Sequence, residues 1–306
     1  MSFLTVGHEN SEAIRIYYED HGAGAPIVLV HGYLLDGHSW EKQESALLDA
    51  GYRVITYDRR GFGNSSRPSV GYDYGTLSAD LNVLLTELDL DDVMLVGFSM
   101  GTGEVTRYLA VYGSRRVRGA VLLAPLPPFL LRTGDNPDGI DRSVFEEFMA
   151  DICDDRPAAV KTFLDKFYNI DILGGSHVSD QAWQNSFHVA IRASARATLG
   201  CAAAWLEDFR GDLPRIDVPV LVVQGSQDRI LPAEATGDRL PALIRDVRSV
   251  VIEGGPHAII WTHADEVNQA LLDFTGHPGR AGTRHSRPEN PPPSGSQNGQ
   301  PADPPL

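Results

Sequence analysis

Short runs of consecutive valine, isoleucine and leucine recur along the chain, and segments with a helical spacing of apolar residues separate them. Such continuous apolarity is typical of strands buried on both faces of a mostly parallel sheet. Between two of the runs, leucines mark one face of a helix. The pattern therefore predicts a doubly wound α/β fold. The predicted strands cover residues 13–18, 26–30, 52–57, 93–96, 118–123, 219–223 and 249–252, and the helical leucines are Leu77, Leu81, Leu84, Leu85 and Leu88.

The alternation of strands and helices breaks once, between Ala124 and Asp217. These ~90 residues show helical patterns without a clear strand, far more than a connection between two parallel strands requires. We expect an inserted helical cap at 125–217 on a core made of residues 1–124 and 218–276, covering the carboxyl ends of the strands and shaping the substrate pocket. Most of its aromatic residues are expected in the cap's own core, with no more than two against substrate. The candidates are Phe129, Phe145, Phe148, Phe163, Phe167, Trp183 and Trp205.

The last 30 residues, 277–306, differ in composition from the rest of the chain. They hold eight of the 20 prolines, together with Gly, Ser, Asn and Gln and almost no apolar side chains, so they cannot bury enough surface to offset the entropy of ordering. We expect a disordered tail and assign no binding site to its three arginines. At the other end, residues 1–24 lack a cationic flank followed by an apolar stretch, so no secretory signal is predicted.

Composition narrows the functional classes. The net charge of -15 argues against binding to nucleic acid or to anionic membranes, since both need clustered Lys and Arg. No apolar run approaches the roughly 18 residues of a transmembrane helix. The two cysteines, Cys153 and Cys201, lack metal-type spacing, and we expect reduced thiols in a cytoplasmic protein. The cysteines thus give no signal of a metal site.

A pentapeptide of the form G-x-S-x-G, GFSMG at 97–101, follows the apolar run 93–96 and precedes a helical pattern. A serine hydroxyl is a weak nucleophile unless it is exposed, deprotonated by a neighbouring base and faced by donors for the oxyanion, and a sharp strand-to-helix turn supplies the exposure. The pentapeptide predicts a nucleophile elbow with Ser99 as the nucleophile. A random chain of this composition contains the motif with a probability of ~0.2, so its context has to decide.

A second apolar run, 26–30, leads into His31-Gly32-Tyr33. In α/β-hydrolases the loop after this strand supplies one backbone donor to the oxyanion, and the residue after the nucleophile supplies the other. We therefore assign the oxyanion hole to the backbone N–H groups of Tyr33 and Met100. Without the elbow, the same residues are typical of a buried strand that ends in a glycine turn.

Two further residues complete a candidate triad in the chain order Ser, Asp, His that this fold uses. Asp228 follows the buried run 219–223, where a carboxylate reaches the crevice above the sheet, although an Asp after a Gly-Ser turn is commonplace. His257 follows the last strand in a Gly-Gly-Pro loop, about 30 residues after Asp228. In this hypothesis Ser99 attacks an acyl carbon, His257 moves the proton, and Asp228 orients the imidazole.

The segment 58–65, DRRGFGNS, follows another predicted strand and contains G-x-G, which raises the alternative of a dinucleotide site. Ser66 replaces the third glycine of that fingerprint, and no acidic residue is evident about 20 residues further on in a strand. We predict a structural turn near the elbow instead.

With these residues in hand, the chain resembles the cofactor-free haloperoxidases of the α/β-hydrolase superfamily, also called non-haem chloroperoxidases, bromoperoxidases or perhydrolases, together with their aryl esterase branch. The resemblance spans roughly residues 10–275 and implies the α/β-hydrolase fold, the triad Ser99, Asp228 and His257, and no metal or haem. It also implies ester hydrolysis, and acyl exchange in which hydrogen peroxide replaces water to give a peracid that oxidises bromide. The segments that support it are HGYLLDGHSW at 31–40, YDRRGFGNSS at 57–66, GYDY at 71–74, VGFSMGTGEV at 96–105, FLLRTGDNPDG at 129–139 and GGPHAIIWTHADEVN at 254–268.

One position departs from the efficient perhydrolases of that family, which look like His-Gly-aromatic-Pro in the oxyanion loop. Here Leu34 follows Tyr33. Proline fixes its own φ and restricts the residue before it. A leucine lacks both restrictions, so we expect the Tyr33 carbonyl group to take a different orientation. We assign substrate contacts to Tyr33, Leu34 and Phe98, and we rank esterase activity above perhydrolysis.

Other functions share these residues. A lactonase, an amidase or a carbon-carbon bond hydrolase would use the same triad, and a non-catalytic binding protein could keep the scaffold. Epoxide hydrolases and dehalogenases are disfavoured because the elbow holds Ser99 rather than a carboxylate, and no motif supports a haem or flavin enzyme. The expected partners are a small acyl substrate and water or hydrogen peroxide. Homo-oligomers are common among similar proteins, but no interface is visible in the sequence.

Overall fold

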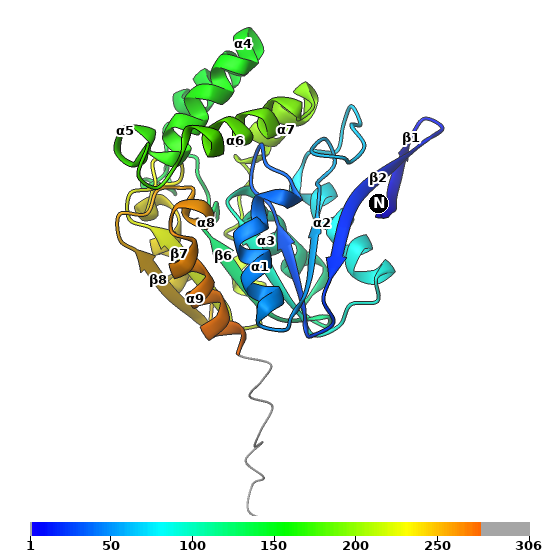
Figure 1. The fold of residues 1–306 in the computed structure, drawn as a ribbon. Coiled ribbons are helices and arrows are strands. Elements are labelled where there is room, and N and C mark those ends of the chain that lie inside the picture. Colours follow the sequence, from blue (N-terminus) through cyan, green and yellow to red (C-terminus); the bar gives the residue numbers. More distant parts are fainter. Residues whose placement is uncertain (1, 277–306) are drawn as a thin grey trace, which may run out of the picture.

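The computed structural model describes residues 2–276, and within them eight strands form one sheet (Figure 1). The strand order is β1-β2-β4-β3-β5-β6-β7-β8. The neighbours from β4 to β8 run parallel, whereas β1 pairs with β2, and β2 with β4, in the antiparallel direction. The strands are β1 (Ser2–Glu9), β2 (Glu12–His21), β3 (Pro26–Val30), β4 (Arg53–Tyr57), β5 (Val93–Phe98), β6 (Val117–Leu123), β7 (Val220–Gly225) and β8 (Val247–Ile252).

The predicted doubly wound α/β fold is confirmed, since each of the seven predicted strands coincides with one of the strands β2 to β8. The sequence analysis misses β1. No residue of this edge strand is fully buried, so it lacks the continuous apolar run by which the other strands were recognised. An edge strand that faces solvent leaves only a weak signal in the sequence.

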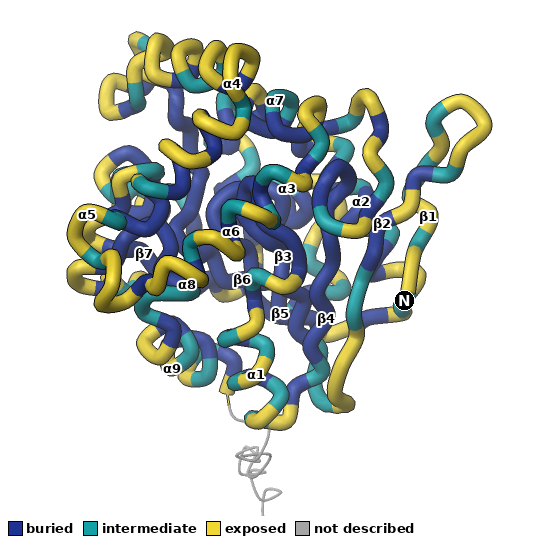
Figure 2. Tube along the Cα trace, turned by 45° about the horizontal axis from the view of Figure 1, so that its top comes forward, coloured by how far each residue is buried: buried dark blue, intermediate teal, exposed yellow. Residues whose placement is uncertain are grey.

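The side chains of the central strands alternate between two hydrophobic cores, one on each face of the sheet. In β3, Ile27 and Leu29 belong to the core under α1 and α9, whereas Val28 and Val30 belong to the core under α2 and α3. Figure 2 shows the central strands buried beneath these layers. The double covering explains why the strands have continuous apolar sequences. The covering helices are α1 (Glu41–Asp49), α9 (Ala264–Thr275), α2 (Tyr74–Glu87) and α3 (Met100–Tyr112).

Four α-helices occupy the interval between β6 and β7, where the sequence predicts a cap. In Figure 1 they form a layer at one end of the sheet. This layer reaches the carboxyl end of β3, where the hydroxyl group of Tyr33 donates to the carbonyl oxygen of Thr198 at 2.7 Å. The boundaries 125–217 for a separate unit stay a prediction. The helices are α4 (Arg142–Tyr168), which is kinked at Asp155, α5 (Ile170–Leu173), α6 (Asp180–Arg192) and α7 (Ala195–Ala204).

Short helices connect the larger elements. They are η1 (Gly37–Trp40), η2 (Leu213–Arg215), η3 (Ala233–Ala235), η4 (Gly237–Ala242) and α8 (Ile259–Thr262). Across residues 2–276, no helix combines the length and the apolarity that crossing a bilayer requires. The predicted disordered tail, 277–306, lies outside the described residues.

Candidate active site

Ser99 lies at the sharp turn between the end of β5 and the first residue of α3. Its backbone angles, φ 53° and ψ -120°, belong to a region that residues other than glycine rarely adopt, so the turn is strained. The turn leaves no room for a side chain at the two neighbouring glycines. A Cβ atom on Gly97 would lie 2.6 Å from the carbonyl oxygen of Gly101, and one on Gly101 would lie 2.2 Å from that of Val30.

The structure brings Ser99, His257 and Asp228 together. The Nε2 atom of His257 lies 2.7 Å from Oγ of Ser99, and the Nδ1 atom lies 2.7 Å from Oδ2 of Asp228. Because a carboxylate only accepts, the Nδ1–H group donates to it, and the serine hydroxyl donates to Nε2. This tautomer leaves Nε2 able to take the serine proton, as a general base must.

Three donors hold the Asp228 carboxylate in place. Its Oδ1 atom accepts from the backbone N–H groups of Ile230 at 2.9 Å and Leu231 at 2.8 Å, and Nε2 of Gln224 donates to Oδ2 at 3.2 Å. A carboxylate bound on both oxygens cannot rotate away from the imidazole. It is therefore placed to orient the ring and to stabilise the imidazolium that forms during a proton transfer.

The loop before the histidine is fixed against the aspartate loop. The backbone N–H group of Gln227 donates to the carbonyl oxygen of Gly255 at 2.9 Å. A Cβ atom on Gly225 would lie 2.3 Å from the same oxygen, so the two loops pack backbone against backbone. Ala258 donates to the carbonyl oxygen of Phe167, in α4, at 3.0 Å. The helical layer above the sheet thus also holds the histidine loop.

Gly32 places the predicted oxyanion loop against the nucleophile. A Cβ atom on Gly32 would lie 3.2 Å from Cβ of Ser99 and 2.9 Å from the ring of Phe98. The next residue, Tyr33, therefore begins close to the nucleophile. Within residues 2–276, the backbone N–H groups of Tyr33 and Met100 have no protein acceptor. Free N–H donors beside a nucleophilic serine are what an oxyanion hole requires.

Leu34 has φ 63°, which places it in the left-handed region that favours glycine. Its side chain and that of Phe98 are buried. The Phe98 ring packs against Trp40, with ring centroids 6.2 Å apart, and against the imidazole of His257 at 5.4 Å. Both side chains belong to the packed surroundings of the nucleophile, and their contact with substrate stays a prediction.

The ring of Tyr33 connects the oxyanion loop to a cavity that is lined mainly by residues of α4. It packs edge-on against Trp205, with ring centroids 4.6 Å apart, and against Phe163 at 5.5 Å. Both of these rings line a cavity of about 210 Å³, as does Ile230. None of the triad residues lines this cavity, so its use as the acyl pocket stays a prediction. Four of the seven aromatic candidates from the sequence line it, namely Phe145, Phe148, Phe163 and Trp205, and which of them touch substrate stays a prediction.

A buried ion pair lies behind the oxyanion loop, and the sequence analysis did not find it. The Nε atom of Arg59 donates to Oε2 of Glu104 at 2.8 Å, and Nη2 of Arg59 donates to the carbonyl oxygen of His31 at 2.8 Å. All three side chains are fully buried. A signal was present in the sequence, since a glutamate among the apolar residues of a buried helix needs a partner of opposite charge.

His31 fixes the first part of the oxyanion loop. Burial, together with the charge of Arg59, lowers its pKa well below the ordinary value, so the ring is neutral. Its Nε2 atom accepts from the backbone N–H group of Arg59 at 3.0 Å, and its Nδ1 atom lies 2.7 Å from the carbonyl oxygen of Gly32. The proton is therefore on Nδ1, where it donates to that carbonyl group.

The segment 58–65 forms a structural turn, as predicted. The carboxylate of Asp58 accepts from the backbone N–H groups of Gly37 at 2.8 Å and Asn64 at 2.7 Å. A Cβ atom on Gly63 would lie 2.1 Å from Oδ2 of Asp58, so the glycine-containing turn closes around a carboxylate of its own. A nucleotide phosphate would meet this negative group, which argues against the dinucleotide alternative.

Comparison with known proteins agrees with this geometry. The family described as alpha/beta hydrolase fold matches residues 25–264. The chain belongs to the α/β-hydrolase family. Its relatives place this hydrolase in the branch of non-haem haloperoxidases and esterases, which confirms the resemblance found in the sequence.

Three similar proteins represent that branch. A Synechocystis protein, whose assignment as a non-haem chloroperoxidase is provisional, is 62% identical over 274 residues, which cover 90% of this hydrolase and 99% of the relative. The bifunctional esterase/perhydrolase DCH of Acinetobacter calcoaceticus is 31% identical and covers 86% of this chain and 96% of its own. The crystal structure of a bromoperoxidase from Bacillus anthracis is 42% identical, with a TM-score of 0.86, over 90% of this chain and 99% of its own.

Proposed function

We propose that this hydrolase is a serine esterase that cleaves small carboxylic esters through an acyl-enzyme. The observation that supports it most directly is the pair of 2.7 Å hydrogen bonds that runs from Ser99 through His257 to Asp228. The free N–H groups beside the serine and the aromatic cavity next to Tyr33 add support. A cavity of about 210 Å³ whose lining includes several aromatic side chains suits a small acyl group or an aryl ring.

Acylation begins when Oγ of Ser99 attacks the ester carbonyl carbon while Nε2 of His257 takes the hydroxyl proton. The carbonyl oxygen becomes negative and accepts hydrogen bonds from the N–H groups of Tyr33 and Met100. Removal of one such donor typically costs about 3 to 4 kcal/mol of transition-state stabilisation. The bond to the alcohol oxygen then breaks, the imidazolium gives its proton to that oxygen, and the acyl group stays on Ser99.

Water completes the cycle. His257 takes one of its protons, the oxygen attacks the acyl carbon, and the carboxylic acid leaves as Ser99 regains its proton. Hydrogen peroxide, which is little larger than water, can take the same place, and the product is then a peracid that oxidises bromide in solution. The esterase/perhydrolase from Acinetobacter supports this exchange as a second activity. The cycle needs only the side chains and N–H groups named here.

A cytoplasmic location and a homo-oligomer are further proposals. Within the described residues Cys153 and Cys201 are unpaired, and free thiols are typical of a reducing compartment. Cell fractionation tests the location, and gel filtration with light scattering tests the oligomer. Recovery of the protein outside the cytoplasm, or the mass of a single chain in solution, would contradict the respective proposal.

Two reactions measured side by side test the function. They are the hydrolysis of p-nitrophenyl acetate and the acetate-dependent bromination of monochlorodimedone by hydrogen peroxide. The wild type should cleave the ester, Ser99→Ala should perform neither reaction, and the control Ser176→Ala, at an exposed serine, should behave as the wild type. Bromination that survives Ser99→Ala contradicts the acyl-enzyme route. A folded wild type that cleaves lactones, amides or carbon-carbon bonds but no ester contradicts the esterase.

A further inference from the structure

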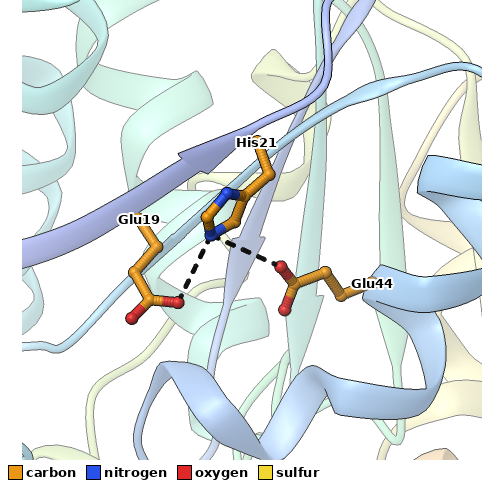
Figure 3. Close-up of side chains that lie close together, drawn as sticks. All are labelled: Glu19, His21 and Glu44. Carbon is orange, nitrogen blue, oxygen red and sulfur yellow. Dashed lines mark ion pairs between the residues drawn. The ribbon is translucent and has the colours of Figure 1, made fainter.

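A cluster of metal-binding side chains lies outside the candidate triad. Figure 3 shows Glu19, His21 and Glu44 turned toward one another. Glu19 and His21 are two residues apart on β2 and so face the same side of the strand, while Glu44 reaches them from α1. One nitrogen and two oxygen atoms from these residues lie within 4.8 Å of one another.

The distances in this cluster fit a shared ion better than direct hydrogen bonds. The Nε2 atom of His21 lies 3.6 Å from Oε2 of Glu19 and 3.9 Å from Oε1 of Glu44, and a hydrogen bond between such atoms is shorter. A tetrahedral zinc ion, with bonds of about 2.0 to 2.2 Å, separates its ligand atoms by roughly 3.4 Å. The imidazole therefore stands between the two carboxylates at nearly the spacing that an ion requires.

The charges of the cluster also favour a cation. The ion-pair partners of Glu19 and Glu44 within residues 2–276 are imidazoles, and none is a lysine or an arginine. A divalent ion would neutralise both carboxylates at once.

Neighbouring groups hold these ligands in position. The hydroxyl group of Tyr17 donates to Oε1 of Glu19, the oxygen that does not face His21. The Nε2 atom of His38 lies 3.5 Å from the same oxygen, and its Nδ1 atom lies 3.8 Å from Oδ1 of Asp36. Groups that contact the ligands of a metal site, without binding the metal, orient those ligands. Tyr17 and His38 are placed to do this for Glu19.

We propose that Glu19, His21 and Glu44 form a surface site for a zinc ion, with water in the fourth position. One imidazole and two carboxylates are a donor set that zinc accepts, whereas magnesium and calcium prefer oxygen ligands alone. The ion joins the antiparallel strand β2 to helix α1. None of its ligands belongs to the candidate triad, so this proposal stands or falls separately from the esterase.

This site revises the expectation of no metal that the sequence analysis gave. Glu19 and His21 are close in sequence, but Glu44 lies on a different element, and the three residues match no metal-binding motif. Only the packing of α1 beside the end of β2 brings the donors together. The sequence offers no signal for that approach.

Calorimetric titration of the full chain with zinc chloride, after removal of metals by EDTA, tests the site. The wild type should bind one ion at this cluster. Loss of a residue that only hydrogen-bonds to a metal ligand weakens metal binding by roughly 10- to 100-fold. His21→Ala and Glu44→Gln each remove a ligand itself, so each should weaken zinc binding by at least this factor. The matched control is His263→Ala, which removes an imidazole from another surface region rich in acidic residues and should leave zinc binding unchanged.

Thermal unfolding gives a second readout that does not depend on activity. His21 is 51% exposed, so His21→Ala should fold and melt with the wild type in EDTA. Zinc should raise the melting temperature of the wild type and not that of the variant. The proposal is overturned if the wild type takes up no zinc, if both cluster variants bind zinc as the wild type does, or if His263→Ala causes the loss instead.

Discussion

The guanidinium group of Arg59 and the carboxylate of Glu104 meet at 2.8 Å with both side chains excluded from solvent. The pair connects α3, which begins at the elbow, to the carbonyl group of His31 at the start of the oxyanion loop. A buried ion pair adds little net stability compared with apolar residues, but loss of one partner leaves an uncompensated charge. We infer that the pair holds the nucleophile and the oxyanion loop in a fixed relation.

Glu104→Gln should therefore lower the free energy of unfolding by about 3 kcal/mol, because Arg59 keeps its charge and loses its counter-ion. Urea denaturation measures the loss. The matched control is Asp20→Asn, which breaks the partly exposed pair of Asp20 with Arg53 and should cost less than about 1 kcal/mol. Equal losses in the two variants would show that burial of the Arg59 pair has no energetic consequence.

Arg59→Lys tests the positioning role of the same pair. Lysine keeps the positive charge but lacks the fork that donates to Glu104 and to the His31 carbonyl group together. We expect kcat for p-nitrophenyl acetate to fall by roughly 10- to 100-fold, since small displacements of reacting groups have effects of this size, while KM changes little because the acyl pocket is untouched. A rise in KM with unchanged kcat would contradict a role in positioning.

The stability of the fold should depend on pH through Asp58. Burial outweighs its backbone donors and raises its pKa from the ordinary 3.8 to about 6. Between these values the folded chain holds a proton that the unfolded chain has released, so the contribution of Asp58 to stability falls as the pH rises through this window. The full loss is at most about 3 kcal/mol.

Urea denaturation of the wild type and of Asp58→Asn, at pH values from about 4 to 7, checks this dependence. The variant lacks the titrating group, so the wild type should lose stability relative to the variant as the pH rises. A difference between the two proteins that stays constant, or that changes in the opposite direction, would mean that burial does not raise the pKa of this carboxyl group.

Leu34→Pro should change the balance between water and peroxide. Proline cannot adopt the φ of 63° found at this position, because its ring holds φ near -65°. The peptide between Tyr33 and residue 34 must therefore reorient, and the Tyr33 carbonyl group moves with it. We expect the variant to gain bromination activity and to lose stability.

The matched control for this change is Leu34→Gly, since glycine adopts positive φ freely. It loses the buried side chain but keeps the loop conformation, so it should retain ester hydrolysis without a gain in bromination. The same gain in Leu34→Gly would assign the effect to the side chain. If Leu34→Pro gains no bromination activity, the orientation of the Tyr33 carbonyl group does not decide between water and peroxide.

The sequence predicts most of the sheet because buried parallel strands leave continuous apolar runs. It also predicts where the candidate triad lies, since Ser99, Asp228 and His257 each follow the carboxyl end of a strand, β5, β7 and β8 respectively. Parallel strands of one sheet end at the same edge, so residues in these three loops lie close to one another. Chain order and strand ends together are enough to suggest their proximity.

The remaining features depend on contacts between segments far apart in the chain. The partner of Glu104 is 45 residues away, and the sequence does not say which arginine reaches it. The positive φ of Leu34 is not a local preference, since leucine itself disfavours that conformation. The zinc ligands come together only when α1 packs beside β2. Tertiary packing, rather than local pattern, decides each of these.

Mass spectrometry after rapid quenching tests the central claim most directly. The wild type is mixed with p-nitrophenyl acetate, quenched within one turnover and digested, and the peptide that contains Ser99 is examined. It should gain the mass of one acetyl group on Ser99, and the same peptide from His257→Ala should remain unmodified over that time. Turnover of the ester without acylation of this peptide, or with the acetyl group on another residue, would contradict the proposed mechanism.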